Sequence, residues 1–125
     1  MSYTTDKIRN VCLLGHGGNG KTSLAESMLF LTGGIDRLGK TVDGNTTCDY
    51  DPEEIKRQIS ISMASAPVRY RDHKLNVLDT PGNFDFAGEV CSALYAADAG
   101  VMVCSAKDGL SVGADRAWKM LRDRN

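Results

Sequence analysis

The sequence predicts an α/β domain with a mainly parallel sheet. Short apolar runs that end at glycine or at a turn alternate with stretches of helical periodicity, which is typical of this class. Two neighbouring apolar runs are joined by only a few polar residues, so one antiparallel strand pair is expected in the sheet. The length of 125 residues allows a single core, and we expect one domain over residues 1–125 with flanking helices.

The first half of the chain predicts a strand, a helix and a long loop. Residues Ile8 to Leu14 are a short apolar run that ends at a glycine, as buried strands do. Residues Thr22 to Thr32 have leucine and methionine at helical spacing and stop before a glycine pair. Residues 34–58 have no steady period, so a long mobile loop is expected, and loops of that length usually serve a function.

The middle of the chain predicts the antiparallel pair. Ile59 to Met63 alternates between apolar and polar residues with period two, and this strand is expected to continue to Tyr70. A turn over residues 71–73 then leads into a returning strand, Lys74 to Leu78.

The last third predicts two helices around one strand. A helix is expected over Phe86 to Ala97, a strand over Gly100 to Ser105, and a final helix from Ser111 to Arg122. At helical spacing, the final helix is expected to bury Ala114, Ala117, Trp118 and Leu121.

Composition excludes several classes of function. A net charge of −1 provides no global basic field for nucleic acid, and DNA is not an expected partner. No apolar run reaches the length of a membrane span and the opening MSYTTDKIRN is no signal peptide, so we expect a cytoplasmic protein without a membrane partner. His16 and His73 have no ligand at zinc spacing. Structural burial is expected for the four cysteines, Cys12, Cys48, Cys91 and Cys104.

A glycine-dense stretch, GHGGNGKTS, lies between the first strand and the first helix. It fits the phosphate-loop pattern G-x-x-x-x-G-K-[ST] without a mismatch, and its context disfavours an ordinary glycine-rich turn. Glycines let several backbone N–H groups converge on a polyphosphate at a helix N-terminus. Lys21 is expected to reach the terminal phosphates and Thr22 to ligate Mg²⁺. The predicted nucleotide-binding residues are Gly15, His16, Gly17, Gly18, Asn19, Gly20, Lys21, Thr22 and Ser23.

A second motif, Asp79-Thr80-Pro81-Gly82, follows the strand that ends at Leu78. An aspartate at the end of a second strand is in the place that supports a nucleotide-bound metal. Gly82 is able to present its N–H to a terminal phosphate, so this loop senses whether that phosphate is present. We expect all four residues, Asp79, Thr80, Pro81 and Gly82, to contribute to the nucleotide site.

Three stretches together carry a family resemblance: GHGGNGKTS, EEIKRQISIS over 53–62, and DTPGNFDF over 79–86. They resemble the G domain of translational GTPases, in particular the elongation factor G family, over nearly the whole chain. The resemblance implies a P-loop G-domain fold that binds GTP or GDP with Mg²⁺. In the full protein it implies GTP hydrolysis on the ribosome, with its RNA and proteins, during tRNA and mRNA translocation. Ribosomal protection proteins of the tetracycline-resistance type and release-factor-three-like GTPases have similar G domains and stay alternatives.

The resemblance also assigns the first switch. The family has Arg-Gly-Ile-Thr-Ile where this chain has RQISI over 57–61, so Ser60 takes the place of the threonine that senses the terminal phosphate and closes over Mg²⁺. Serine keeps the hydroxyl but lacks the methyl that restrains the rotamer. The expected metal residues are Thr22, Ser60 and Asp79, the last acting through water. The alternative for Ser60 is an ordinary polar residue facing out of a strand.

Two departures from the family affect the site. Gly18 replaces an aspartate that helps to hold a monovalent cation, so that aid is expected to be missing. Asn83 replaces the histidine that positions the attacking water, and with Gly82 and Ser60 it completes the candidate catalytic set. Because phosphoryl transfer depends on positioning, we expect GTP binding with weak hydrolysis, or reliance on groups from the ribosome. In the long loop, Asp49, Tyr50, Glu53 and Glu54 are ribosomal RNA contacts or a solvated acidic surface, and the solvated surface is favoured.

The end of the sequence predicts a G domain truncated at its carboxyl side. The guanine-recognition sequence Asn-Lys-x-Asp does not occur, so guanine specificity rests on the resemblance alone. The strand 100–105 is expected to become an exposed apolar edge that favours self-association, and the isolated chain is expected to be inactive or very weak. A truncated, non-catalytic phosphate-binding stub is the alternative from another class. An ATP-binding P-loop protein fits the DTPG and first-switch sequences less well.

Overall fold

The computed structural model describes residues 2–124, so Met1 and Asn125, the ends of the predicted domain, lie outside the described residues. One four-stranded sheet has the order β2-β3-β1-β4. Its strands are β1 (Ile8–Leu14), β2 (Ala64–Tyr70), β3 (His73–Asp79) and β4 (Ala99–Met102). Strand β1 pairs in parallel with β3 and β4, and β2 pairs antiparallel with β3. The predicted α/β class with one antiparallel strand is confirmed.

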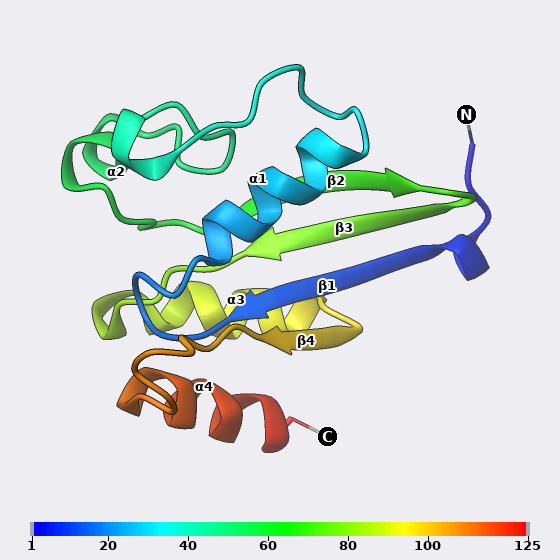
Figure 1. The fold of residues 1–125 in the computed structure, drawn as a ribbon. Coiled ribbons are helices and arrows are strands. Elements are labelled where there is room, and N and C mark those ends of the chain that lie inside the picture. Colours follow the sequence, from blue (N-terminus) through cyan, green and yellow to red (C-terminus); the bar gives the residue numbers. More distant parts are fainter. Residues whose placement is uncertain (1, 125) are drawn as a thin grey trace.

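Helices cover both faces of the sheet (Figure 1). Helix α1 (Lys21–Leu31) lies on one face, while α3 (Ala87–Ala96) and α4 (Val112–Arg122) lie on the other. A short helix, α2 (Pro52–Arg57), belongs to the cyan-to-green segment that projects beyond the sheet at the carboxyl end of β1. Three single 3₁₀ turns complete the set: η1 (Thr5–Lys7), η2 (Thr41–Asp43) and η3 (Phe84–Phe86). In the part of the chain described, no helix is long and apolar enough to span a bilayer.

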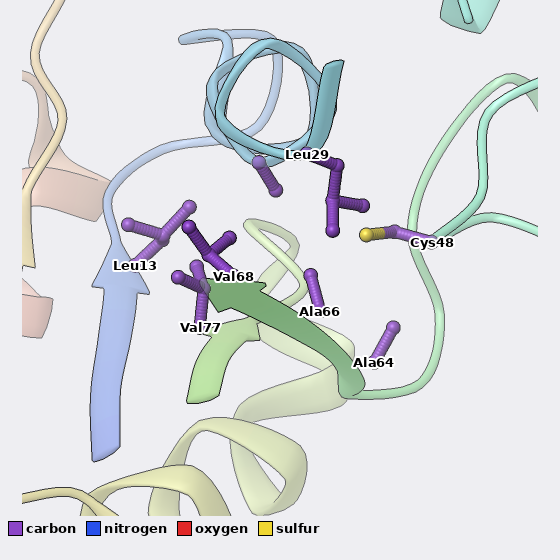
Figure 2. Close-up of a cluster of buried hydrophobic side chains, with 8 residues drawn as sticks. Leu13, Leu29, Cys48, Ala64, Ala66, Val68 and Val77 are labelled. Carbon is purple, nitrogen blue, oxygen red and sulfur yellow. The ribbon is translucent and has the colours of Figure 1, made fainter. Parts of the chain in front are cut away.

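Each face of the sheet has its own apolar cluster. Under α1, the buried residues are Leu13, Ala25, Leu29, Cys48, Ala64, Ala66, Val68 and Val77. Figure 2 shows the Cys48 sulfur pointing toward Leu29. The burial of Cys48 in this apolar cluster packs the segment that precedes β2 against the core. On the opposite face, Cys12, Leu14 and Leu78 pack against α3 and α4. Burial of both faces is what the apolar runs of the central strands require.

The parallel strands place their carboxyl ends at one edge of the sheet (Figure 1). The loop after β1 and the loop after β3 leave from neighbouring strands there, because Leu13 is in register with Asp79. Ligands of open α/β sheets bind at this edge. The fold therefore brings the two predicted nucleotide motifs together.

Two expectations about the segment 34–63 are wrong. The segment 34–58 is not one irregular loop, because it contains η2 and α2. Helix α2 has its own start signal: Asp51 is the N-cap, Pro52 is at the first helical position, and Asp51 and Glu54 form a capping box. Residues 59–63 are not a strand, and β2 begins only at Ala64. The backbone N–H groups of Ile61, Ser62 and Met63 bond to glutamate side chains instead of to a neighbouring strand.

Expectations at the carboxyl side need three corrections. Strand β4 ends at Met102 rather than Ser105, so Cys104 lies beyond the strand and is exposed, as is Cys91. Trp118 is 54% exposed because α4 turns its two alanines, Ala114 and Ala117, toward the sheet. Strand β4 lies at a sheet edge, as expected, and Val101 on it is 40% exposed.

Candidate nucleotide-binding site

The loop between β1 and α1 is built on glycine conformations. Gly15 has φ +143°, and a Cβ there would collide with the backbone carbonyl of Val103. Gly20, the N-cap of α1, has φ +92° in the left-handed region. These positions require glycine because other residues rarely adopt such conformations. The Asn19 amide donates to the Val103 carbonyl at 3.1 Å and ties the loop to the segment after β4.

Lys21 lies folded over this loop. Its Nζ donates to the carbonyl oxygens of Gly15 and His16, each at 3.0 Å, and the side chain is 5% exposed. Burial lowers the pKa of Lys21, although Asp79 and Asp49 act in the opposite direction. An ammonium group that is buried and held only by carbonyl dipoles favours an anion in the same cavity.

Two hydroxyl–carboxylate pairs meet beside the lysine. The Thr22 hydroxyl donates to Asp79 Oδ2 at 2.6 Å, and the Ser60 hydroxyl donates to Asp49 Oδ1 at 2.7 Å. The two hydroxyl oxygens lie 3.0 Å apart. Asp79 Oδ1 is buried and has no hydrogen-bond partner. The structure thus brings together Thr22, Ser60 and Asp79, and adds a residue that the sequence interpretation had placed in solvent.

The pair of carboxylates is electrostatically unfavourable without a cation. Burial raises the pKa of Asp79 to about 6, with the negative charge of Asp49 acting in the same direction and the Thr22 hydrogen bond opposing it. Burial likewise raises the pKa of Asp49, against the hydrogen bond from Ser60. Both shifts mean that burial disfavours the ionised carboxylates, and the nearby like charges add to this effect.

These oxygens fit a magnesium ion. Mg²⁺ prefers oxygen ligands about 2.1 Å away in an octahedron, and adjacent ligands are then about 3.0 Å apart, which is the separation of the Thr22 and Ser60 hydroxyl oxygens. Within residues 2–124, no three His, Cys, Asp or Glu side chains gather as metal ligands, so hydroxyl and phosphate oxygens have to complete such a site. The unpartnered Asp79 Oδ1 is available to hold an ion's water.

A cavity of about 480 Å³ opens in front of these groups, a size typical of small-molecule sites. Its lining includes predicted residues from both motifs and the first switch: His16, Gly17, Gly18, Gly20, Lys21, Thr22, Ser23, Ser60, Gly82 and Asn83. The sequence interpretation missed five other lining residues: Thr41, Asp49, Gln58, Ile59 and Phe84. Five predicted residues are outside the lining, namely Gly15, Asn19, Asp79, Thr80 and Pro81.

The residues outside the lining support the site from behind. The Thr80 hydroxyl donates to the carbonyl of Leu13 at 2.6 Å, so it ties β1 to the loop after β3. Gly82, which does line the cavity, packs directly on the backbone of Gly17, where a Cβ would collide. This close packing of two glycines places the second motif against the phosphate loop.

Asn83 lies at the rim of the cavity. Its side-chain oxygen accepts a hydrogen bond from the backbone N–H of Asp85 at 3.0 Å and caps η3. Its amide NH₂ donates no hydrogen bond within the described residues, and a neutral amide is no general base. Next to Asn83, the rings of Phe84 and His16 pack edge to face, with their centroids 6.1 Å apart.

The acidic residues of the long loop do not form a solvated surface. Asp49 is 5% exposed and Glu54 is 2% exposed, whereas Tyr50 is 72% exposed. Glu54 accepts hydrogen bonds from the backbone N–H groups of Asp51, Ile61 and Ser62. The expectation is therefore wrong for Asp49 and Glu54. The capping box D-P-E-E was the one sequence signal for Glu54, and no local signal marked Asp49.

Comparison with known proteins agrees with this geometry. The family of the elongation factor Tu GTP binding domain matches residues 6–125. The chain is 37% identical to elongation factor G 2 of Borreliella afzelii over 112 residues, which cover 90% of the chain and 17% of that protein. It is 36% identical to the mitochondrial ribosome-releasing factor 2 of Yarrowia lipolytica, covering 93% of the chain and 14% of that factor. A crystal structure of a Thermus thermophilus protein superposes with a TM-score of 0.92 at 43% identity, covering 94% of the chain and 18% of that protein.

Proposed function

The chain belongs to the elongation factor Tu GTP-binding domain family, and on that premise we propose that it is the amino-terminal segment of an elongation factor G-like GTPase. The observation that carries the proposal is that Lys21, Thr22 and Ser60 line one cavity, with Asp79 hydrogen-bonded to Thr22 behind it. A lysine beside the phosphate loop and paired hydroxyls at metal-ligand spacing suit a nucleotide polyphosphate with Mg²⁺.

Each motif has a role in this proposal. The phosphate loop and Lys21 bind the phosphates of GTP or GDP, and Gly82 offers its N–H to the terminal phosphate. Thr22 and Ser60 turn their hydroxyl oxygens toward Mg²⁺, and Asp79 supports it from behind. Bound Mg²⁺ supplies charge stabilisation on the terminal phosphate. Ser60 contributes only when the first switch is closed, so its engagement reports the terminal phosphate.

The intact protein acts on the ribosome in this proposal, as a cytoplasmic factor. The chain spans only 14–17% of the length of the Borreliella and Yarrowia relatives. These relatives include a factor named for ribosome release as well as an elongation factor, so the two names differ in the step of translation they serve. The G domain supplies nucleotide-dependent switching to either kind of step.

Nucleotide competition tests the proposal. The intact protein is expected to bind a fluorescent GTP analogue in a Mg²⁺-dependent manner, and GDP but not ATP is expected to displace it. Lys21→Ala is expected to weaken this binding by about 10- to 100-fold, because one charge-assisted contact is lost. Equal displacement by ATP would contradict a guanine-specific site. Binding of inorganic triphosphate alone would favour the phosphate-binding stub.

Hydrolysis is proposed to be limited at Asn83. The Asp85 N–H uses one lone pair of the Asn83 side-chain oxygen, so the second lone pair and the amide NH₂ remain to orient a water, without the imidazole of a histidine. Single-turnover GTP hydrolysis by the intact protein on ribosomes is expected to be faster for Asn83→His, with GTP affinity unchanged. A variant that is no faster would show that Asn83 does not limit the rate.

A further inference from the structure

We infer that Asp49 is a positioning residue for Ser60, a role that rests on the proposed nucleotide and Mg²⁺ site. Asp49 comes from the segment between η2 and α2, eleven residues before Ser60. It is 5% exposed and lines the cavity beside Lys21 and Thr22. Its neighbour Cys48 is buried in the apolar cluster under α1, which holds this part of the backbone against the core.

The hydroxyl protons account for what Asp49 does. A hydroxyl has one proton and two lone pairs, and a carboxylate only accepts hydrogen bonds. Thr22 gives its proton to Asp79, and Ser60 gives its proton to Asp49. Each carboxylate therefore draws the proton to its own side and leaves hydroxyl lone pairs free for a cation. Asp49 therefore orients the Ser60 hydroxyl in the same way that Asp79 orients the Thr22 hydroxyl.

A serine at position 60 needs a partner that orients its hydroxyl. A threonine hydroxyl is restrained because its side chain is branched at Cβ, whereas a serine hydroxyl rotates more freely among its rotamers. Ser60 is half-buried, and Glu54 holds the backbone on either side of it, so the free choice that remains is the side-chain rotamer. The 2.7 Å hydrogen bond to Asp49 selects the rotamer in which Ser60 Oγ lies 3.0 Å from Thr22 Oγ1. Outer-sphere partners of this kind typically change metal affinity by about 10- to 100-fold.

The test is a double-mutant cycle on the intact protein, with Mn²⁺ affinity measured by electron paramagnetic resonance in the presence of a non-hydrolysable GTP analogue. Asp49→Ala and Ser60→Ala are each expected to weaken Mn²⁺ binding by about tenfold. In the Ser60→Ala background, Asp49→Ala is expected to add less than a roughly twofold change, because the group it positions is already gone. Asp49→Asn, which keeps an acceptor oxygen, is expected to lose about threefold.

The controls separate the possible failures. Asp43→Ala removes one exposed negative charge from the same segment and is expected to leave Mn²⁺ affinity unchanged. If Asp49→Ala does not fold, Asp49→Ser replaces it in the cycle, because its hydroxyl is too short to reach Ser60. Additive losses in the cycle, or Asn and Ala variants of equal affinity, would show that Asp49 acts through its charge and would overturn the inference. A wild-type protein that binds neither the analogue nor Mn²⁺ would instead overturn the proposed function.

Discussion

The phosphate loop and the segment 39–63 border the same cavity but are held by different kinds of contact. The phosphate loop is held by its own backbone and by a neighbouring backbone: Lys21 bonds to two loop carbonyls, Asn19 bonds to the Val103 carbonyl, and Gly17 packs on Gly82. The segment 39–63 is held by carboxylates. Glu26 of α1 accepts from the N–H groups of Gly39 and Thr47.

The carboxylate contacts continue along the segment. Glu54 accepts three backbone N–H groups, two of them just after Ser60, and Glu89 of α3 accepts the N–H of Met63 at 2.7 Å. Burial raises the pKa of the Cys48 thiol, and four buried acids act in the same direction: Asp79, Glu26, Asp49 and Glu54. The negative charges of these four acids repel one another, so they disfavour the observed conformation of the segment until a cation binds.

These two kinds of contact indicate which part of the site is able to change conformation. The phosphate loop depends on short-range sterics that do not change with ligand. The segment 39–63 depends on hydrogen bonds to carboxylates of α1, of α3 and of its own helix α2, and the buried negative charge beside it is relieved by a bound cation. We therefore expect the segment to open at lower free energy than the loop when nucleotide and Mg²⁺ are removed. Substitutions at Glu54, Asp79 and Gln58 test this contrast between the loop and the segment.

Glu54→Ala should release the segment without releasing the phosphate loop. Three backbone N–H groups lose a charged acceptor, and we expect a loss of about 3 kcal/mol in the stability of the segment. Amide hydrogen exchange should accelerate at Ile61 and Ser62 and stay slow in β1. The matched control is Glu53→Ala, which removes an exposed acid of the same helix together with its surface pairs to Lys56 and Arg57. Equal acceleration in β1 would show that the two regions are not separate.

Asp79→Asn should remove one pH-dependent contribution to the stability of the metal-free protein. The folded-state pKa of Asp79 is raised from 3.8 to about 6, so ionisation of this group destabilises the fold. The stability that this group contributes is therefore fully present below about pH 4 and is lost as the pH rises through about 6. A shift of this size corresponds to about 2–3 kcal/mol.

Urea unfolding of both proteins in EDTA between about pH 4 and pH 8 checks this sign. The asparagine variant should be more stable than the wild type near pH 7.5 and equal to it near pH 4. Its Mn²⁺ affinity should nevertheless be lower near pH 7.5, because the supporting carboxylate is lost. If the free energies of unfolding of the two proteins change with pH in parallel, ionisation of Asp79 does not destabilise the metal-free fold.

Gln58→Gly should strengthen the segment slightly. Gln58 has φ 55°, a left-handed conformation at the end of α2. The family sequence Arg-Gly-Ile-Thr-Ile has glycine at this position. Relief of this strain should stabilise by about 1 kcal/mol, reduced by the loss of the exposed hydrogen bond from Gln58 Nε2 to the Val42 carbonyl. Gln58→Ala is the control, since it loses the same bond but keeps the Cβ. Thermal unfolding should rank the glycine variant above the alanine variant, and the reverse order would refute strain at this position.

Much of the nucleotide site could be predicted because its signals are local. Glycines at Gly15 and Gly20, followed by Lys21 and Thr22, form a contiguous pattern that dictates a backbone shape and a charge placement together. Asp79 needed only one further step, the end of an apolar strand. The hairpin over 64–79 was predicted from its short turn and the returning apolar strand, whereas the alternation used for its first strand lies in residues 59–63, before β2 begins.

The segment 39–63 could not be predicted in the same way. The alternation in Ile59 to Met63 indicated a strand, but the N–H groups of its last three residues bond to Glu54 and Glu89. Those acceptors come from α2 and α3, and the acceptor of Gly39 comes from α1. A pattern of side chains within one stretch does not reveal hydrogen bonds to carboxylates that lie elsewhere.

The sequence by itself determined the sheet class, the phosphate loop and the position of Asp79, because each depends on residues adjacent in the chain. Only the tertiary structure decided that Asp49 and Glu54 are buried and that Ser60 meets Thr22. It also decided that Trp118 is exposed, because α4 turns its alanines toward the sheet. The physical reason is that burial of a charged side chain is favourable only when distant parts of the fold supply its partners, and local sequence carries no record of those partners.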